Sequence, residues 1–137
     1  MDIKKIGIAG LIGFVVHAVF GAVSFPLFYE AHLTTLAGKF PEVVQFPPNM
    51  AVAALGGIMY VFVMAIIYDK MGVDSVEGGA ITGAWFGAAK WTFINTQFMA
   101  LMPNVFEAKF VVIDILISTV MYAVAGAAMG WALNRFK

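Results

Sequence analysis

The sequence has no cysteine and few charged residues, and each shortage excludes a class of protein. Without cysteine there is no disulfide framework, no thiolate nucleophile and no cysteine-ligated zinc or haem. Charged residues form 12% of the 137 residues, about half the share of a soluble domain. Eight basic residues balance eight acidic ones, so no positive surplus is available to bind the phosphates of a nucleic acid.

Sequence motifs of common catalytic chemistry are also missing. There is no His-x-x-x-His pair, no Gly-x-Ser-x-Gly, no phosphate-binding loop and no pair of carboxylates at one membrane depth. Glu30 and His32 are only two candidate metal ligands in a flexible loop, which is too few to predict a site. We therefore predict that the protein is not an enzyme and requires no metal or cofactor.

Hydrophobic residues, in contrast, make up 62% of the chain and form four long runs. A helix crosses a bilayer core of about 30 Å with roughly 20 apolar residues, whereas barrel strands alternate and are about 10 residues long. The runs cover residues 6–28, 50–68, 78–102 and 108–132, and the interior of each of the last two is interrupted by one charged residue. They predict a single all-α transmembrane domain over residues 1–137, an integral membrane four-helix bundle with an outer loop at 30–49.

Basic residues near the ends of the runs predict the orientation. If both termini share a side, that side holds Lys4, Lys5, Lys70, Arg135 and Lys137, and the other holds Lys39 and Lys109. The positive-inside rule then places both termini in the cytoplasm, in a multi-pass protein of the bacterial inner membrane. Interfacial aromatic residues would include Tyr68 inside and Tyr29 outside.

The three connections differ in length. The loop at 30–49 has room for a short interfacial helix over 31–37, followed by the breakers Gly38 and Pro41. The other two connections are short, which predicts that the second and third helices, and the third and fourth, are antiparallel neighbours.

Small residues repeat at four-residue spacing on every predicted helix. In lipid, helices associate where small residues let backbones approach, because burying apolar side chains gains little there. We expect helix packing, mainly within the chain and otherwise against a neighbouring chain, at Gly13, Gly21, Gly79, Gly83, Gly87, Gly126 and Gly130. Ala53 and Gly57 form a similar pair on the second helix.

Three ionisable residues fall inside the predicted spans, where a charge costs on the order of 3 kcal/mol. His17 and Lys90 lie near mid-bilayer, whereas Asp114 enters from the outer end of the fourth helix, level with Asn95 and Gln97. The flexible stem of Lys90 makes an ion pair with Asp114 feasible. Such a pair either fixes the helix register or lies on a path for a solute, ion or proton. The alternative is a neutral Lys90 in a dry site.

His17 lies between Gly13 and Gly21 on its helix face. A hydrogen bond across a helix interface would explain a neutral imidazole there, and binding of haem or a quinone is the alternative. The other histidine, His32, falls in the outer loop, so a two-histidine haem site is not predicted.

Several stretches of the second half form a recognisable set: residues 79–85, residues 102–109 with Asn104, Phe106 and Glu107, the pair Ile113-Asp114, and residues 123–131. This set resembles the bacterial four-helix membrane proteins of domain-of-unknown-function family 1761, and residues 25–29 resemble that family more loosely. The resemblance implies that Asn104, Phe106, Glu107 and Asp114 are shared positions at the corner between the third and fourth helices. It implies the fold but no activity, and Lys90 lies outside it.

These features predict a small non-catalytic membrane protein that acts as a homo-oligomer or as an accessory or structural subunit of a larger membrane complex. Its partners would be the lipid bilayer and other transmembrane helices, and no nucleic acid. The alternative is a transporter or channel for a small solute, ion or proton that uses Asp114 and Lys90. Haem or quinone binding near His17 is the second alternative.

Overall fold

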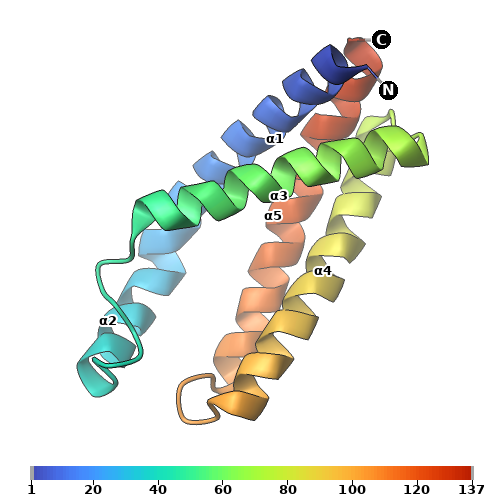
Figure 1. The fold of residues 1–137 in the computed structure, drawn as a ribbon. Coiled ribbons are helices and arrows are strands. Elements are labelled where there is room, and N and C mark those ends of the chain that lie inside the picture. The colour runs from blue at the N-terminus through green and yellow to red at the C-terminus, as the bar shows by residue number, and fades with distance from the viewer. Residues whose placement is uncertain (1, 137) are drawn as a thin grey trace.

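The computed structural model describes residues 2–136, which form four long helices with short connections (Figure 1). In chain order the elements are α1 (Ile3–Ser24), the π-helical turn η1 (Phe25–Tyr29), α2 (Glu30–Lys39), α3 (Met50–Met71), α4 (Val76–Leu101) and α5 (Ala108–Arg135). No strand occurs between residues 2 and 136, so the prediction of an all-α fold is confirmed. Three stretches are long and apolar enough to cross a membrane: Ile3–Lys39, Met50–Met71 and Ala108–Arg135.

Local signals determine where the helices begin and end. Asp2, Asn49 and Ser75 are the N-caps of α1, α3 and α4, and the side chain of each accepts a hydrogen bond from a backbone N–H of the first turn. α3 ends at Gly72, whose φ of 71° is the left-handed conformation that glycine adopts most readily. The short turn that follows leads directly into α4.

The first helical segment is longer than the sequence predicted. α1 continues through η1 into α2, so Ile3–Lys39 replaces the predicted span 6–28, and the outer loop shrinks to residues 40–49. Pro26 lies in η1. A proline has no backbone N–H to donate, and the π turn at this position tolerates the missing hydrogen bond without ending the helical segment. Gly38 does not end the helix, which continues to Lys39. The side chains of Phe28 and His32 stack on Phe110 of α5 and stabilise the extension.

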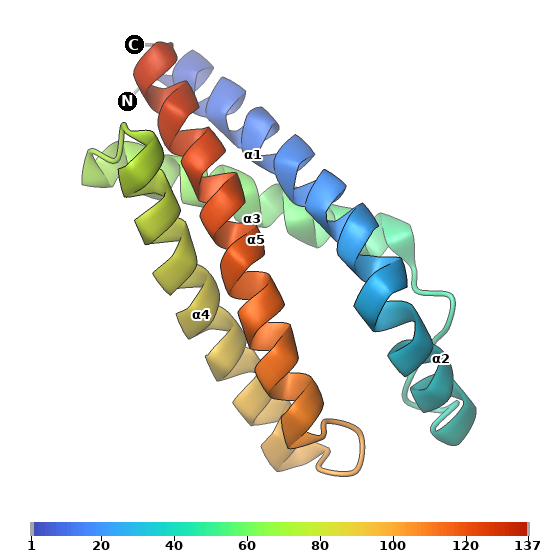
Figure 2. The same cartoon turned by 180° about the vertical axis from the view of Figure 1, so that it is seen from behind.

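The helices pack unequally, as the two opposite views show (Figures 1 and 2). α4 lies along α5, as predicted, and α1 packs against both α5 and α3. The predicted α3–α4 pair is wrong: the two helices meet at the turn around Gly72 and then diverge. α3 packs against α1 instead, with the ring of Phe62 placed against Gly10. A Cβ at Gly10 would lie only 2.7 Å from this ring, so the absence of a side chain at Gly10 makes room for it.

Glycines form the contact between α4 and α5. A Cβ at Gly79 would collide with the carbonyl oxygen of Gly126, and one at Gly83 would collide with that of Tyr122. A Cβ at Gly130 would meet the carbonyl oxygen of Ser75, so the contact is close from both sides. The two backbones touch here without intervening side chains.

The remaining predicted packing glycines behave differently from one another. Gly87 faces the side chain of Tyr122, and Gly13 faces that of Met129. Gly21 has open space where a Cβ would lie, so no packing requirement acts on it.

Candidate functional site

Asp114 on α5 lies at the centre of a buried polar site. Its side chain is 4% exposed. The hydroxyl of Tyr29, from η1, donates to Oδ1 at 2.5 Å, and Nδ2 of Asn95, from α4, donates to Oδ2 at 2.7 Å. Three segments that are distant in sequence therefore converge on one carboxyl group. Each oxygen receives one donor, an arrangement suited to an ionised carboxylate, which only accepts hydrogen bonds.

A cavity of about 340 Å³ lies beside this carboxyl group. Its polar lining comes from four segments and consists of His17, Ser24, Tyr29, Asn95, Asp114 and Ser118. Its aromatic lining consists of Phe25, Trp91, Phe98, Phe106 and Phe110 as well as the Tyr29 ring. The volume falls at the lower end of the range of about 300–1,000 Å³ that is usual for ligand pockets, so the cavity suits a compact ligand.

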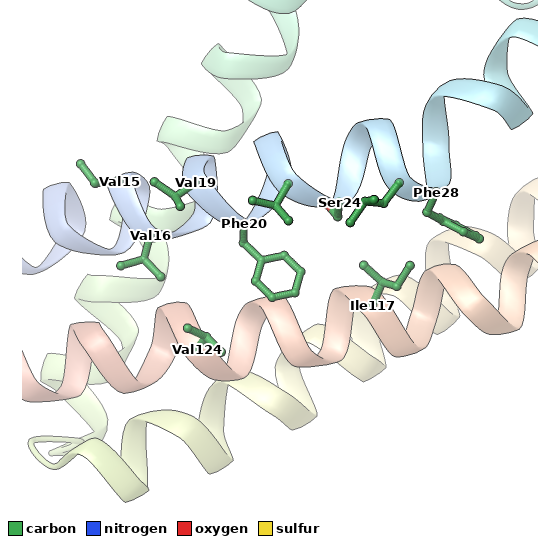
Figure 3. A pocket seen from close by; sticks show the side chains of 10 residues that line it. Val15, Val16, Val19, Phe20, Ser24, Phe28, Ile117 and Val124 are labelled. Carbon is green, nitrogen blue, oxygen red and sulfur yellow. The ribbon is translucent and has the colours of Figure 1, made fainter.

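A second, apolar groove of about 530 Å³ runs between α1 and α5 (Figure 3). Phe20 projects from α1, and Ile117 and Val124 project from α5, into the space between the two helices (Figure 3). Ser24 and Ile117 line both the groove and the cavity beside Asp114. The polar cavity and the apolar groove are therefore adjacent.

Lys90 does not pair with Asp114, although the sequence made such an ion pair feasible. Its Nζ donates to the hydroxyl of Tyr122 at 3.1 Å and lies 3.5 Å from the centroid of the Tyr60 ring. A cation over an aromatic face gains about 0.5–2 kcal/mol. Tyr122 is eight residues, or about 12 Å of helix, further inward on α5 than Asp114. The ammonium group thus meets two tyrosines at its own depth before its stem reaches the carboxylate.

His17 lines the cavity, and its ring packs edge-on against Tyr122 with the centroids 5.2 Å apart. Its Nδ1 is buried and has no hydrogen-bond partner among residues 2–136, so this nitrogen does not make the predicted bond across the interface. His32 stacks on Phe110 and lies fifteen residues further along the same helical segment, or about 22 Å. A haem held by both histidines does not fit this geometry, and in the part of the chain that the structure describes no three His, Asp or Glu side chains group around a metal site.

The remaining predicted positions contribute less to the site. Gln97 is exposed and does not line the cavity, unlike Asn95. Asn104 and Glu107 are exposed at the corner between α4 and α5, whereas Phe106 lines the cavity and stacks on Phe98 with centroids 4.9 Å apart.

Tyrosine side chains are the part of the site that the sequence did not predict. Tyr29 was expected at the outer interface, yet its hydroxyl binds Asp114, and Tyr60 and Tyr122 surround the ammonium group of Lys90. A usable signal existed, because a tyrosine in an apolar helix usually places its hydroxyl beside a polar group, and the chain has only four tyrosines. The Tyr60 hydroxyl is an exception, since it is buried without a hydrogen-bond partner among residues 2–136.

Comparison of the chain with protein-family models, with curated proteins and with solved structures found no match.

Proposed function

We propose that the chain is a multi-pass protein of the bacterial inner membrane with four crossings. Three helical stretches have the length and apolarity of membrane spans. The 26 residues of α4 extend about 39 Å, more than the roughly 30 Å of a bilayer core. Because α4 lies along α5, it shares the depth of an apolar helix of spanning length, which supports α4 as the fourth crossing.

The positions of the basic residues support a cytoplasmic location for both termini. α1 begins and α5 ends at the same end of the molecule, where Lys5 forms an ion pair with Asp69 at 2.6 Å (Figures 1 and 2). Lys39 at the end of α2 and Lys109 at the start of α5 lie at the opposite end. This distribution follows the positive-inside rule. Lys137, which the sequence places on the cytoplasmic side, lies outside the described residues.

The same proposal assigns the protein a non-catalytic role, as a homo-oligomer or as an accessory or structural subunit of a larger membrane complex. The observation that carries it is the first half of α3. Residues 50–56 are all exposed, and five of the seven residues at 51–57 are alanine or glycine. Small residues are typical of helix–helix contacts in membranes rather than of surfaces that face only lipid. This half of α3 is therefore suited to receive a helix from outside the protomer.

Cysteine crosslinking tests this role directly, because the chain has no cysteine of its own. We expect Ala53→Cys, on the exposed half of α3, to form a disulfide-linked dimer on mild oxidation in native membranes. Leu116→Cys is the matched control, since Leu116 is 61% exposed but lies on α5. In the subunit form of the proposal, a photo-crosslinking residue at 53 gives one discrete larger adduct instead. If position 53 yields neither product, or if position 116 yields the same ones, the role is contradicted.

Transport of a small solute, ion or proton is the second candidate function. The observation that favours it is the carboxyl group of Asp114, which borders a cavity inside the helices and has no basic partner among the described residues. Asp114→Asn is expected to reduce flux into proteoliposomes strongly. Because Lys90 lies on a separate aromatic site, Lys90→Met is expected to reduce flux less. Flux that is equal in the wild type and in Asp114→Asn would exclude this candidate.

A further inference from the structure

We propose that the cavity beside Asp114 binds a lipophilic organic cation, whose charged group pairs with the carboxylate and whose apolar part lies against the aromatic lining. This inference names the substrate class for the transport candidate. It concerns binding only, so it can hold where transport fails.

The first argument is the missing counter-charge. Asp114 is buried, and its two contacts, from Tyr29 and Asn95, come from neutral donors. Lys90, the lysine whose ion pair with Asp114 seemed feasible from sequence, is engaged by Tyr60 and Tyr122 instead. Buried charges in membrane proteins are normally paired, because an isolated charge is costly at this depth. A cationic ligand in the adjoining cavity would supply the partner that residues 2–136 do not.

The second argument is the nature of the lining, which selects an organic cation over a metal ion. Faces of aromatic rings attract ammonium groups, and quaternary ammonium ligands are commonly recognised by such rings. Trp91, Phe98 and Phe106 line the cavity together with the carboxylate. Metal ions such as Ca²⁺ and Mg²⁺ would require several oxygen ligands, whereas Asp114 is the only acidic residue among those that line the cavity.

The third argument is the route of entry. The groove between α1 and α5 is apolar and shares Ser24 and Ile117 with the cavity (Figure 3). Gly21 lines the cavity on the same helix and has open space where a side chain would begin. An amphiphile dissolved in the bilayer can therefore lie with its apolar part in the groove and its cationic group at the carboxylate. The ligand expected from this geometry is a lipophilic amine or quaternary ammonium compound rather than a hydrophilic ion.

Equilibrium binding of radiolabelled benzyltrimethylammonium to the purified full chain in detergent micelles tests the inference. Unlabelled benzyltrimethylammonium should compete, whereas neopentylbenzene, in which carbon replaces the charged nitrogen, should not. We expect Asp114→Asn to weaken binding at least about 30-fold, because it removes one partner of a buried charge pair. Asp69→Asn removes a carboxylate outside the cavity and should leave the affinity within about twofold.

A second variant keeps the inference testable if Asp114→Asn does not fold. Gly21→Leu adds a side chain to the cavity lining at a position where a Cβ meets nothing within 4 Å and leaves Asp114 itself unchanged, and it should also abolish binding. Equal competition by neopentylbenzene, or unchanged affinity in either folded variant, would overturn the inference. Binding that persists where proteoliposomes show no flux would exclude transport alone and leave the binding site established.

Discussion

Replacement of Gly83 with valine is expected to lower the free energy of unfolding by about 3 kcal/mol or more, because it forces α4 away from α5. A Cβ at this position would overlap the backbone carbonyl oxygen of Tyr122 and lie 3.1 Å from the hydroxyl of Tyr68. A side chain can rotate away from such a collision, but a backbone carbonyl within a helix cannot. Titration with sodium dodecyl sulfate, followed by far-ultraviolet circular dichroism, measures the loss.

Gly7→Val is the matched control for this prediction. It makes the same chemical change within a long helix, but nothing lies within 4 Å of a Cβ placed at Gly7. Its effect should stay within about 1 kcal/mol, the range of helix propensities. Similar losses in the two variants would show that helix propensity, rather than contact between α4 and α5, explains the requirement for glycine.

The packing of α4 on α5 could be predicted from sequence, whereas the position of α3 could not. The tight turn at residues 102–107 and the glycines at 79, 83, 126 and 130 both favour α4 beside α5. The turn at residues 72–75 is even shorter, but a short turn only joins the ends of two helices and does not set the angle between them. That angle depends on side-chain packing, here on Phe62 of α3 against Gly10 of α1, which spacing in one helix does not reveal.

The sequence allowed a short helix over 31–37, but its continuity with the first helix was missed because the prediction relied on hydropathy. Residues 30–39 include Glu30, two threonines and Lys39, so they end an apolar run without ending the helix. Aromatic stacking of His32 on Phe110 and burial of Leu36 stabilise this part of the helix. Such contacts with distant segments are visible only in the fold.

The sequence predicted the depth of the site residues in the bilayer but not which side chains each of them contacts. Counting residues placed Asn95 level with Asp114, and the two side chains are hydrogen-bonded. The same counting brought Lys90 within reach of Asp114, because it estimates height along the bilayer and takes no account of side chains on other helices. Tyr60 and Tyr122 occupy the path of the lysine stem and bind its ammonium group first.

The hydrogen bond from Asn95 to Asp114 leads to a second large expected effect. Asn95→Leu keeps a similar side-chain volume but leaves Oδ2 of a buried carboxylate without its donor. We expect the free energy of unfolding to fall by about 2–3 kcal/mol, the contribution of a hydrogen bond to a charged group. Thr96→Val is the control, since Thr96 is exposed and bonds only within its own helix. Its effect should be within about 0.5 kcal/mol.

A double-mutant cycle separates the loss of this bond from a loss of packing. In an Asp114→Leu background the acceptor is absent, so Asn95→Leu should cost little, because replacing both partners with apolar groups of similar shape is nearly neutral. The double variant should therefore be more stable than the sum of the two single losses predicts, by about 1 kcal/mol or more. Strictly additive losses would mean that Asn95 stabilises the fold by filling space between α4 and α5, and that the carboxylate is held by Tyr29 alone.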